Sequence, residues 1–573
     1  MASQAVSTRS PDGADGEGFA KVLQDWRTQG RTLVLQHRGE FEELLDRLDA
    51  QLDAGRLADA AAAAQVAAAY AVFWHPGIFV SHRLERALRR IGAGALGATM
   101  PRDRPRAAGK PLRVLHVASQ VAPIGGHTRN IQRWIDADTG AVHSLCVTRQ
   151  TRALPPALSR AIAASGGTAS CANAAIGGPL AWAAALGSRM AAADIVFLHV
   201  DNQDIVPFVA LAGMTQRPPV ALLNHADHVL WLGADFVDAV VSTRQSGHRL
   251  CADRRDIPAD RNLTLPLCLD PVARTLDRAD AKRALGIDPE DIVLLTIARS
   301  VKFRPIGGVG FADALLPVLR ADPRVRLVAV GPGAVADWSA ARAQVPGRIL
   351  ALPETPDTGR YLDAADIYID SFPFASNTSL LEAGLHGLPL VTRQPFGPGC
   401  EIMGADSFGM DGCLQTCRSP AEFQAVVCRL VRDPAWRREL GTATRAGIMA
   451  TNMGEGFRSA LDALYARVLD LPRRQAASGP DPVSCLDDVD LFSHFVFGHS
   501  GDRETIRTAA QRHALAVEIS LRSMPPWSRL GAWVRLARGR SFTFRNGKAV
   551  LKYLVPEWLT VRARLARTGC LVE

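Results

Sequence analysis

The most constraining stretch of the sequence is residues 361–392, where two apolar segments flank a polar loop and a short apolar helix. Residues 366–370 (DIYID) are rich in β-branched and aromatic side chains, which predicts a short strand. A proline-containing loop follows; Asn, Thr and Ser at 377–379 are then good N-cap residues, and the leucines and alanine at 380–385 predict a short apolar helix. Residues 388–391 predict the next buried strand. A strand, a helix and a strand in such close succession indicate an α/β sheet with crossover connections.

The start of this predicted helix is a candidate site for an anion. Asn377, Thr378 and Ser379 follow directly after a strand and a loop, so the free backbone N–H groups and the positive end of the helix dipole would face a ligand. Glu382 lies one turn further on, where its carboxylate could accept hydrogen bonds from a ribose diol. An ordinary capped helix with a surface glutamate is the alternative that this stretch alone leaves open.

Residues 371–391 (SFPFASNTSLLEAGLHGLPLV) resemble the donor-binding segment of GT-B glycosyltransferases. The greatest similarity is to the family of O-GlcNAc transferase and the bacterial cytoplasmic protein N-glucosyltransferases. The resemblance implies an α/β fold with two Rossmann-like, doubly wound domains facing each other across a cleft. It also implies that Asn377, Thr378 and Ser379 hold a nucleotide diphosphate and that Glu382 holds the ribose. The family usually has Asp at the position of Glu382, which is a departure from its pattern.

Composition sets the limits of the remaining expectations. A chain of 573 residues is too long for one core and suggests roughly two to four domains. The net charge of +9 favours anionic partners such as nucleotides or acidic lipid, although a solvated basic face is an equal alternative. The ten cysteines include no C-x-x-C pair, which favours reduced thiols over disulfides or a zinc site. With neither an apolar signal sequence nor an apolar run of about eighteen residues, the chain is expected to be cytoplasmic.

Apolar periodicity and Pro- and Gly-rich linkers divide the chain into segments. Strands alternate with helices in two of them, which is the rhythm of a parallel, doubly wound sheet. The helical segment is expected to dock an acceptor or a partner, or to shield one face of the next domain. The predicted segments are a disordered start (1–17), an α-helical domain (18–100), an N-terminal Rossmann-like acceptor domain (112–275), a C-terminal Rossmann-like donor domain (285–470) and a mixed C-terminal extension (485–573).

Polar side chains follow one strand of the first Rossmann-like domain closely. The predicted strand at 219–224 leads into HADH, which places His225, Asp227 and His228 at its carboxyl end. These ends line the ligand crevice of an open α/β sheet, so an imidazole or a carboxylate here could take a proton from an acceptor. The segment NHADHVLWLG also resembles bacterial members of the family, in which a histidine there faces the sugar and acceptor. A metal site or a structural His–Asp pair is the alternative, although no third cluster of ligands lies nearby in the sequence.

A glycine loop follows the first predicted strand, residues 113–119. Gly125 and Gly126 would allow a ligand to approach the backbone closely, and His127 follows them directly. A strand, a glycine loop and a helix form the usual entry to a nucleotide-binding fold, although the G-x-G-x-x-G fingerprint is absent. The resemblance implies that this loop lies on the acceptor side, across the cleft from the donor.

Two basic residues follow the first predicted strand of the second Rossmann-like domain. Arg299 and Lys302 lie three residues apart on the turn after the predicted strand at 291–298, where both could offset the charge of a departing pyrophosphate. The family has a polar residue and a lysine at this spacing, whereas Arg299 is similar to the Arg of other GT-B families. A solvated basic turn is the alternative. The resemblance further implies that backbone groups near Leu352 and Pro353 bind the nucleobase.

One departure bears on stereochemistry. Many retaining GT-B families carry two glutamates eight positions apart, and Phe374 stands where the first would precede Glu382. The sequence therefore favours an inverting displacement, in which a base activates the acceptor. The first candidate for this base is His228, and the alternatives are Asp227, His225 and His127. The resemblance implies a UDP-linked hexose or N-acetylhexosamine as donor, with no metal and no other cofactor.

Three functions stay open at this point. The first is transfer of sugar to protein side chains, and the second is transfer to a polysaccharide or glycolipid. The third is a non-catalytic GT-B scaffold. The expected partners are a UDP-sugar and an acceptor protein or glycan, with no nucleic acid. An anionic membrane is a further candidate partner, because residues 527–540 (WSRLGAWVRLARGR) are amphipathic, basic and Trp-bearing; packing of this helix on the body of the protein is the alternative.

Overall fold

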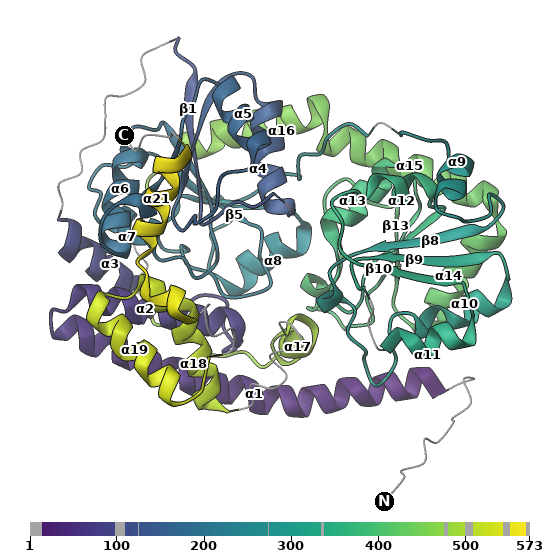
Figure 1. Cartoon of the computed structure of the whole chain (residues 1–573), viewed down its shortest axis with the longest axis horizontal. Helices are drawn as coiled ribbons and strands as arrows, with labels where there is room; N and C mark the ends of the chain where they lie inside the picture. The colour runs from purple at the N-terminus through teal and green to yellow at the C-terminus, as the bar shows by residue number, and fades with distance from the viewer. Residues whose placement is uncertain are drawn as a thin grey trace, which may run out of the picture.

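The computed structural model describes residues 14–97, 109–123, 125–272, 274–333, 337–474, 479–498, 508–542 and 550–568. Two parallel sheets form two lobes, and helices cover both faces of each sheet (Figure 1). The predicted fold of two doubly wound Rossmann-like domains, with helices in front of them, is confirmed. The disorder predicted for residues 1–17 lies mostly outside the described residues, because helix α1 begins at Ala14.

Three helices precede the first sheet. They are α1 (Ala14–Asp53), α2 (Leu57–Phe73) and α3 (His82–Leu96). Alanine dominates α2, which favours a helix and permits close packing on both sides, so nearly all of its residues are buried. The three helices share one hydrophobic core with a face of the first sheet rather than forming a core of their own.

The first sheet has seven parallel strands in the order β3-β2-β1-β4-β5-β6-β7. Successive strands are added toward one edge of the sheet from β1 to β3 and toward the other edge from β4 onward. The strand order therefore reverses between β1 and β4, which is where an open α/β sheet places its ligand crevice. The strands are β1 (Leu112–Ala118), β2 (Ala141–Val147), β3 (Ala169–Cys171), β4 (Ile195–His199), β5 (Val220–Asn224), β6 (Ala239–Ser242) and β7 (Asn262–Thr264). The connecting helices are α4 (Gly126–Ala137), α5 (Pro156–Ala164), α6 (Pro179–Ala191), α7 (Val206–Ala212) and α8 (Gln245–Arg254).

The second sheet has six parallel strands in the order β10-β9-β8-β11-β12-β13, and its winding reverses between β8 and β11. The strands are β8 (Ile292–Ile297), β9 (Val325–Val330), β10 (Ile349–Leu352), β11 (Ile367–Ile369), β12 (Leu390–Arg393) and β13 (Leu414–Cys417). The helices around it are α9 (Arg278–Ala284), α10 (Leu316–Ala321), α11 (Asp337–Gln344), α12 (Gly359–Ala364), α13 (Asn377–Leu385), α14 (Pro420–Arg432) and α15 (Pro434–Asn452).

Two helices join the lobes. Helix α16 (Gly454–Asp470) follows the second sheet but returns to the first lobe, where the hydroxyl of Tyr465 accepts a hydrogen bond of 2.9 Å from the indole of Trp134. Helix α1 runs beneath both lobes (Figure 1). Its later turns pack in the first core, whereas Val22 and Trp26 near its start pack against the core of the second sheet. The relative position of the lobes is therefore fixed at both edges.

All secondary structure in the described part of the C-terminal extension is helical. Helix α17 (Asp488–Phe497) lies between the lobes, whereas α18 (Ala509–Ser520), α19 (Pro526–Arg538) and α21 (Glu557–Thr568) cover the first lobe (Figure 1). Arg27 of α1 donates two hydrogen bonds of 2.7 Å to the carboxylate of Asp488, which holds α17 against α1. Within the described residues, we find no helix that combines the length and apolar character needed to cross a bilayer.

Candidate active site

The loop between β11 and α13 begins the candidate site. Asp370, at the end of β11, is buried and accepts a hydrogen bond of 2.9 Å from the backbone N–H of Ser376. Ser376 is the residue that precedes the helix, so Asn377, Thr378 and Ser379 form the first turn of α13 instead of its cap. The side chain of Ser376 caps no backbone N–H, so the helix start keeps its free N–H groups for an anion.

Lys302 reaches this loop from the second sheet. It ends the short 3-10 helix η2 (Ser300–Lys302) that follows β8, and its ammonium group donates a hydrogen bond of 2.8 Å to the carbonyl oxygen of Ala375. The ammonium nitrogen also lies 4.4 Å from the centre of the Phe374 ring, a cation–π contact. Burial lowers the pKa of Lys302 to about 8; the carboxylate of Asp370 opposes this effect, and the charge of Arg299 adds to it. Arg299 itself is exposed.

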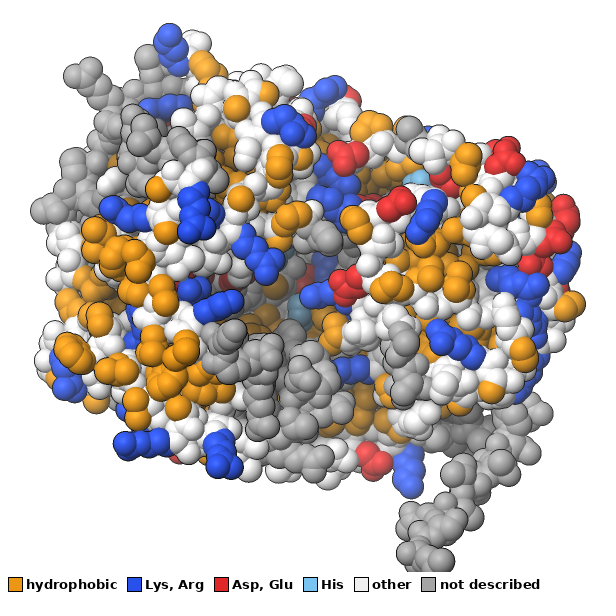
Figure 2. Space-filling view, in the orientation of Figure 1, with side chains coloured by type: hydrophobic (Ala, Val, Ile, Leu, Met, Phe, Trp, Pro, Cys, Tyr) orange, Lys and Arg blue, Asp and Glu red, His pale blue; other side chains and the backbone are white. Residues whose placement is uncertain are grey.

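The glycine loop of the first lobe meets the start of α13 directly. A methyl group placed on Gly126 would lie 3.1 Å from the hydroxyl oxygen of Thr378, closer than ordinary packing allows. Glycine at this position therefore permits the two loops to touch. The sequence predicts these loops for opposite sides of one cleft, and the structure brings them together there. In Figure 2 the space between the lobes is a hollow in which Lys, Arg and His side chains are visible.

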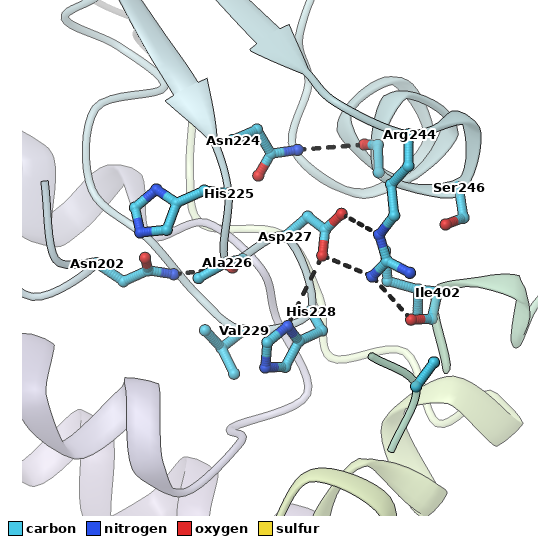
Figure 3. A network of polar contacts seen from close by, with 12 residues as sticks. Asn202, Asn224, His225, Ala226, Asp227, His228, Val229, Arg244, Ser246 and Ile402 are labelled. Carbon is cyan, nitrogen blue, oxygen red and sulfur yellow. Dashed lines mark hydrogen bonds and ion pairs between the residues drawn. The ribbon is translucent and has the colours of Figure 1, made fainter. Parts of the chain in front are cut away.

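The HADH segment after β5 forms the opposite wall, and Figure 3 shows its polar contacts. The guanidinium group of Arg244 donates hydrogen bonds of 2.6 and 2.7 Å to the two carboxylate oxygens of Asp227. The same group donates to the carbonyl oxygens of Ile402 (3.0 Å) and Gly404 (2.8 Å) in the second lobe. Arg244 holds the pKa of Asp227 far below its usual range, against the opposing effect of burial. Asp227 thus forms an ion pair that links the lobes, and its role as a proton acceptor stays a prediction that this low pKa does not favour.

The three predicted histidines lie around this ion pair. The rings of His127 and His225 stack with their centres 4.5 Å apart and their planes at 17°. His228 lies with its Nδ1 atom 3.7 Å from the carboxylate of Asp227, and its ring packs against Phe374 at 5.3 Å. Desolvation by the surrounding protein lowers the pKa of all three, in the case of His127 to about 3; the side chains of His127 and His228 are half-buried, whereas that of His225 is exposed. All three are therefore neutral at pH 7 and able to accept a proton.

Two of the predicted donor contacts have other partners in this structure. The carboxylate of Glu382 pairs with Arg129 at 2.8 Å and with Arg133 at 3.2 Å, both from α4 of the first lobe. A ribose would have to replace or join these cations. The carbonyl oxygen of Leu352 accepts backbone hydrogen bonds of 2.9 Å from both Gly331 and Gly333, which uses both of its lone pairs.

The other predicted nucleobase position is open to solvent. Pro353 is exposed at the end of β10, and a proline has no backbone N–H to donate. A base bound here could use the carbonyl oxygen of Pro353 as an acceptor, and the binding of the nucleobase near Leu352 and Pro353 stays a prediction. Among the side chains that the structure describes, no group of three or more His, Cys, Asp or Glu is placed to hold a metal ion.

Sequence reasoning missed two residues of the site. Phe497, at the end of α17, packs its ring 4.3 Å from that of His228 and 5.1 Å from that of Phe374, so the C-terminal extension helps to build the cleft. No motif around Phe497 could have indicated this contact. Arg244 stands seventeen residues after Asp227 and pairs with it only because β5 and β6 are neighbours in the sheet.

A comparison with protein families identifies the lobe that holds Lys302 and α13. Residues 292–433 match the family described as glycosyl transferases group 1. The second lobe is a group 1 glycosyltransferase domain. The prediction of a GT-B glycosyltransferase is confirmed at this level, since the matched region spans β8 to β13 and faces a second Rossmann-like lobe. No curated protein matches the chain.

Several solved structures are similar to this chain. One is Anabaena Alr3699/HepE in complex with UDP and glucose, with 16% identity and a TM-score of 0.45 over 63% of this chain and 100% of that one. A second is a mutant of O-GlcNAc transferase from Thermobaculum terrenum, with 17% identity and a TM-score of 0.42 over 78% of this chain and 84% of that one. A third is a glycosyltransferase from Rickettsia africae, with 10% identity and a TM-score of 0.48 over 63% and 99%.

Proposed function

We propose that this chain transfers a hexose or N-acetylhexosamine from a UDP-linked donor to an acceptor. The observation that carries the proposal is the meeting of Lys302, the start of α13 and the glycine loop of the first lobe at one place in the cleft. A diphosphate at this place would receive backbone N–H groups from α13 and a positive charge from Lys302. Solved structures similar to this chain include one with UDP-glucose bound, which agrees with a UDP-linked donor.

The same residues supply the charge that the reaction requires. As the sugar departs, negative charge develops on the leaving diphosphate, and Lys302 with Arg299 would neutralise it without a metal ion. A pKa of about 8 keeps Lys302 mostly protonated at pH 7, and a bound diphosphate would raise that pKa further because opposite charges favour the ionised form.

An inverting displacement agrees with the surroundings of Phe374. Its ring fills the space between Lys302 and His228, at the position where retaining families have their first glutamate. No carboxylate is offered there as a nucleophile. The proton of the acceptor would go to a neutral imidazole of the set His127, His225 and His228. We propose protein side chains as acceptors, on the strength of the resemblance of residues 371–391 and of the helical segment that shares its core with the acceptor lobe.

Incubating the purified protein with a panel of UDP-sugars tests the donor. We expect one UDP-sugar to be consumed at a rate that is proportional to the enzyme concentration and is the same with and without EDTA. We also expect peptide acceptors to gain the mass of one sugar. The matched control is the same panel with GDP- and ADP-linked sugars. No binding of UDP and no consumption of any UDP-sugar would instead identify a scaffold, and loss of turnover in EDTA would refute metal independence.

A second acceptor class is favoured by one surface. The described parts of α18, α19, α21 and their connections carry ten Lys and Arg against two acidic residues. Trp527 of α19 is 84% exposed, and Leu530, Leu551 and Leu559 are exposed as well. Figure 2 shows hydrophobic side chains gathered over this part of the first lobe, with Lys and Arg side chains around them. Exposed Trp and Leu among basic residues suit the headgroup region of an anionic membrane, where a glycolipid acceptor would lie.

Vesicle binding separates this surface from a merely solvated one. We expect the protein to co-sediment with vesicles that contain phosphatidylserine or phosphatidylglycerol and to remain in solution with pure phosphatidylcholine. Trp527→Ser should weaken the binding by about tenfold, since it removes a large apolar contact with the bilayer. Met449→Ser changes a residue of α15 that is 40% exposed and is the control. Equal binding by all three proteins, or none, would refute membrane contact through α19.

A further inference from the structure

Three buried histidines form a hydrogen-bonded row across the first sheet. His143 lies on β2, His116 on β1 and His199 on β4, and none of the three side chains is exposed. Nδ1 of His143 lies 3.0 Å from Nε2 of His116, and Nδ1 of His116 lies 3.0 Å from Nε2 of His199. The three strands are neighbours, and the three rings lie on the sheet face that α4 covers, where Trp134 packs edge-on against His116.

One end of this row is a carboxylate at the edge of the lobe. Nε2 of His143 lies 3.1 Å from a carboxylate oxygen of Asp138, whose side chain is 11% exposed. The same oxygen accepts a hydrogen bond of 2.8 Å from the hydroxyl of Tyr465, and the other oxygen accepts one of 3.1 Å from the backbone N–H of Gly140. These contacts hold the pKa of Asp138 below its usual range, against the opposing effect of burial. Asp138 is therefore ionised at neutral pH and can only accept hydrogen bonds.

The other end of the row lies at the cleft. His199 is the last residue of β4, and its ring centre lies 5.9 Å from that of His127, which in turn stacks on His225. The Nδ1 atom of His199 is buried and has no hydrogen-bond partner among the described residues. The row therefore runs from the carboxylate of Asp138 to a ring that packs against one of the two histidines that we propose as proton acceptors, and the ring nitrogen at its cleft end has no hydrogen-bond partner among the described residues.

The anion at one end sets the direction of every hydrogen bond in the row. Burial lowers the pKa of His116 and of His199 far below the ordinary value, so each ring is neutral and carries one proton. With the proton of His143 on Nε2, where it faces the carboxylate of Asp138, Nδ1 of this ring is bare and accepts from His116. His116 then accepts from His199 in the same way. The nitrogen left without a partner, Nδ1 of His199, is consequently a bare lone pair, which costs less than a buried N–H with no acceptor.

We propose that Asp138, His143 and His116 are positioning residues that keep Nδ1 of His199, the ring of the row nearest to His127, without a proton. This inference rests on the proposed function in one respect only, namely that His127 and His225 receive the proton of the acceptor. When that proton arrives, the imidazolium so formed has as its neighbour a ring that carries a lone pair on Nδ1 instead of an N–H bond. His199 is fully buried, so the local dielectric constant on its side is low and the interaction is strengthened. The row therefore makes the cleft histidines better proton acceptors than they would be beside a ring that carries an N–H bond on Nδ1.

Nitrogen-15 NMR of histidine-labelled protein tests the direction of the row without any turnover. His143, His116 and His199 are assigned by comparison with His143→Gln, His116→Gln and His199→Gln proteins. We expect each of the three rings to carry its proton on Nε2 and to leave Nδ1 bare. A proton on Nδ1 of His199, or a doubly protonated His143, would mean that the row runs in the opposite direction and would overturn the proposal.

Steady-state kinetics of Asp138→Asn tests the link to the chemistry. An amide can donate as well as accept, so the side chain at position 138 no longer imposes a direction on the hydrogen bonds of the row. We expect kcat to fall by about tenfold while KM for the UDP-sugar stays unchanged, which is the usual effect of removing a hydrogen-bond partner that orients a catalytic group. Tyr465→Phe is the control, because it removes the other side-chain donor to Asp138 and leaves the carboxylate in place. Equal kcat in all three proteins would refute the positioning role, whereas a wild-type protein without turnover would refute the proposed function and leave the NMR result standing.

Discussion

Replacing Lys302 by alanine is expected to lower sugar-transfer turnover by about 10²- to 10³-fold, the usual cost of removing one charged or hydrogen-bonding group that stabilises a transition state. Lys302 is half-buried, donates to the carbonyl oxygen of Ala375 and lies over the ring of Phe374. No other cation described in the structure occupies this position, because Arg299 is exposed on the turn. The loss should therefore appear mainly in kcat, where charge on the leaving diphosphate matters most.

The measurement is release of UDP at saturating donor, with circular dichroism and thermal unfolding as a check on folding. Lys21→Ala on the exposed side of α1 removes the same charge far from the cleft and should leave turnover within about twofold. Turnover of Lys302→Ala equal to wild type would remove the diphosphate from the place that we assign to it. A variant that fails to fold would be replaced by Lys302→Met, which keeps the apolar stem against Phe374.

Arg244→Met is expected to lower the free energy of unfolding by about 3–5 kcal/mol, since it leaves the buried carboxylate of Asp227 without its cation. The same change removes the hydrogen bonds to Ile402 and Gly404, which are contacts between the lobes. Guanidinium unfolding at pH 7 measures the effect. Arg283→Met, in an exposed pair with Asp280, is the control and should change stability by less than about 1 kcal/mol. A loss as small as that of the control would show that the ion pair does not support the fold.

The pH dependence of the same pair follows from the sign of the pKa shift. Arg244 lowers the pKa of Asp227 below its unfolded value, so the stabilisation is fully present above the unfolded pKa of about 3.9 and is lost as the pH falls below it. In Arg244→Met the carboxylate has no cation to favour its charged form. In this variant, the loss of stability that the protonation of Asp227 causes at low pH should therefore disappear or become a gain. The double variant Arg244→Met/Asp227→Leu should recover part of the lost stability, because it leaves no unpaired charge.

The sequence predicted well those parts of the site that depend on neighbouring residues. The loop at residues 371–376 and the helix that follows it were recognisable because strand, turn and cap preferences act over a few residues. Ser376, and not Asn377, nevertheless precedes the first turn of the helix, because the buried carboxylate of Asp370 accepts a hydrogen bond from the backbone N–H of Ser376. That contact closes the loop one residue earlier than cap preferences alone indicate.

Contacts between segments that lie far apart in the sequence could not be predicted from local sequence patterns. The ion pair between Glu382 and Arg129 depends on how the two lobes face each other, and the row of His143, His116 and His199 depends on the order of strands in the sheet. The sequence contains no motif for either. Phe497 illustrates the same limit, because no motif surrounds it and only the position of α17 between the lobes places it beside His228.

The continuous helix α1 has a consequence for how substrates enter and products leave. Its first turns are anchored by Val22 and Trp26 in one half of the molecule, while its later turns are anchored in the other half. A rod fixed at both ends resists a rocking motion of the two halves, so a wide opening of the enzyme requires the rod to detach at one end or to bend. If α1 stays attached at both ends, nucleotide can enter and leave only through small movements of the glycine loop and of the two arginines that pair with Glu382.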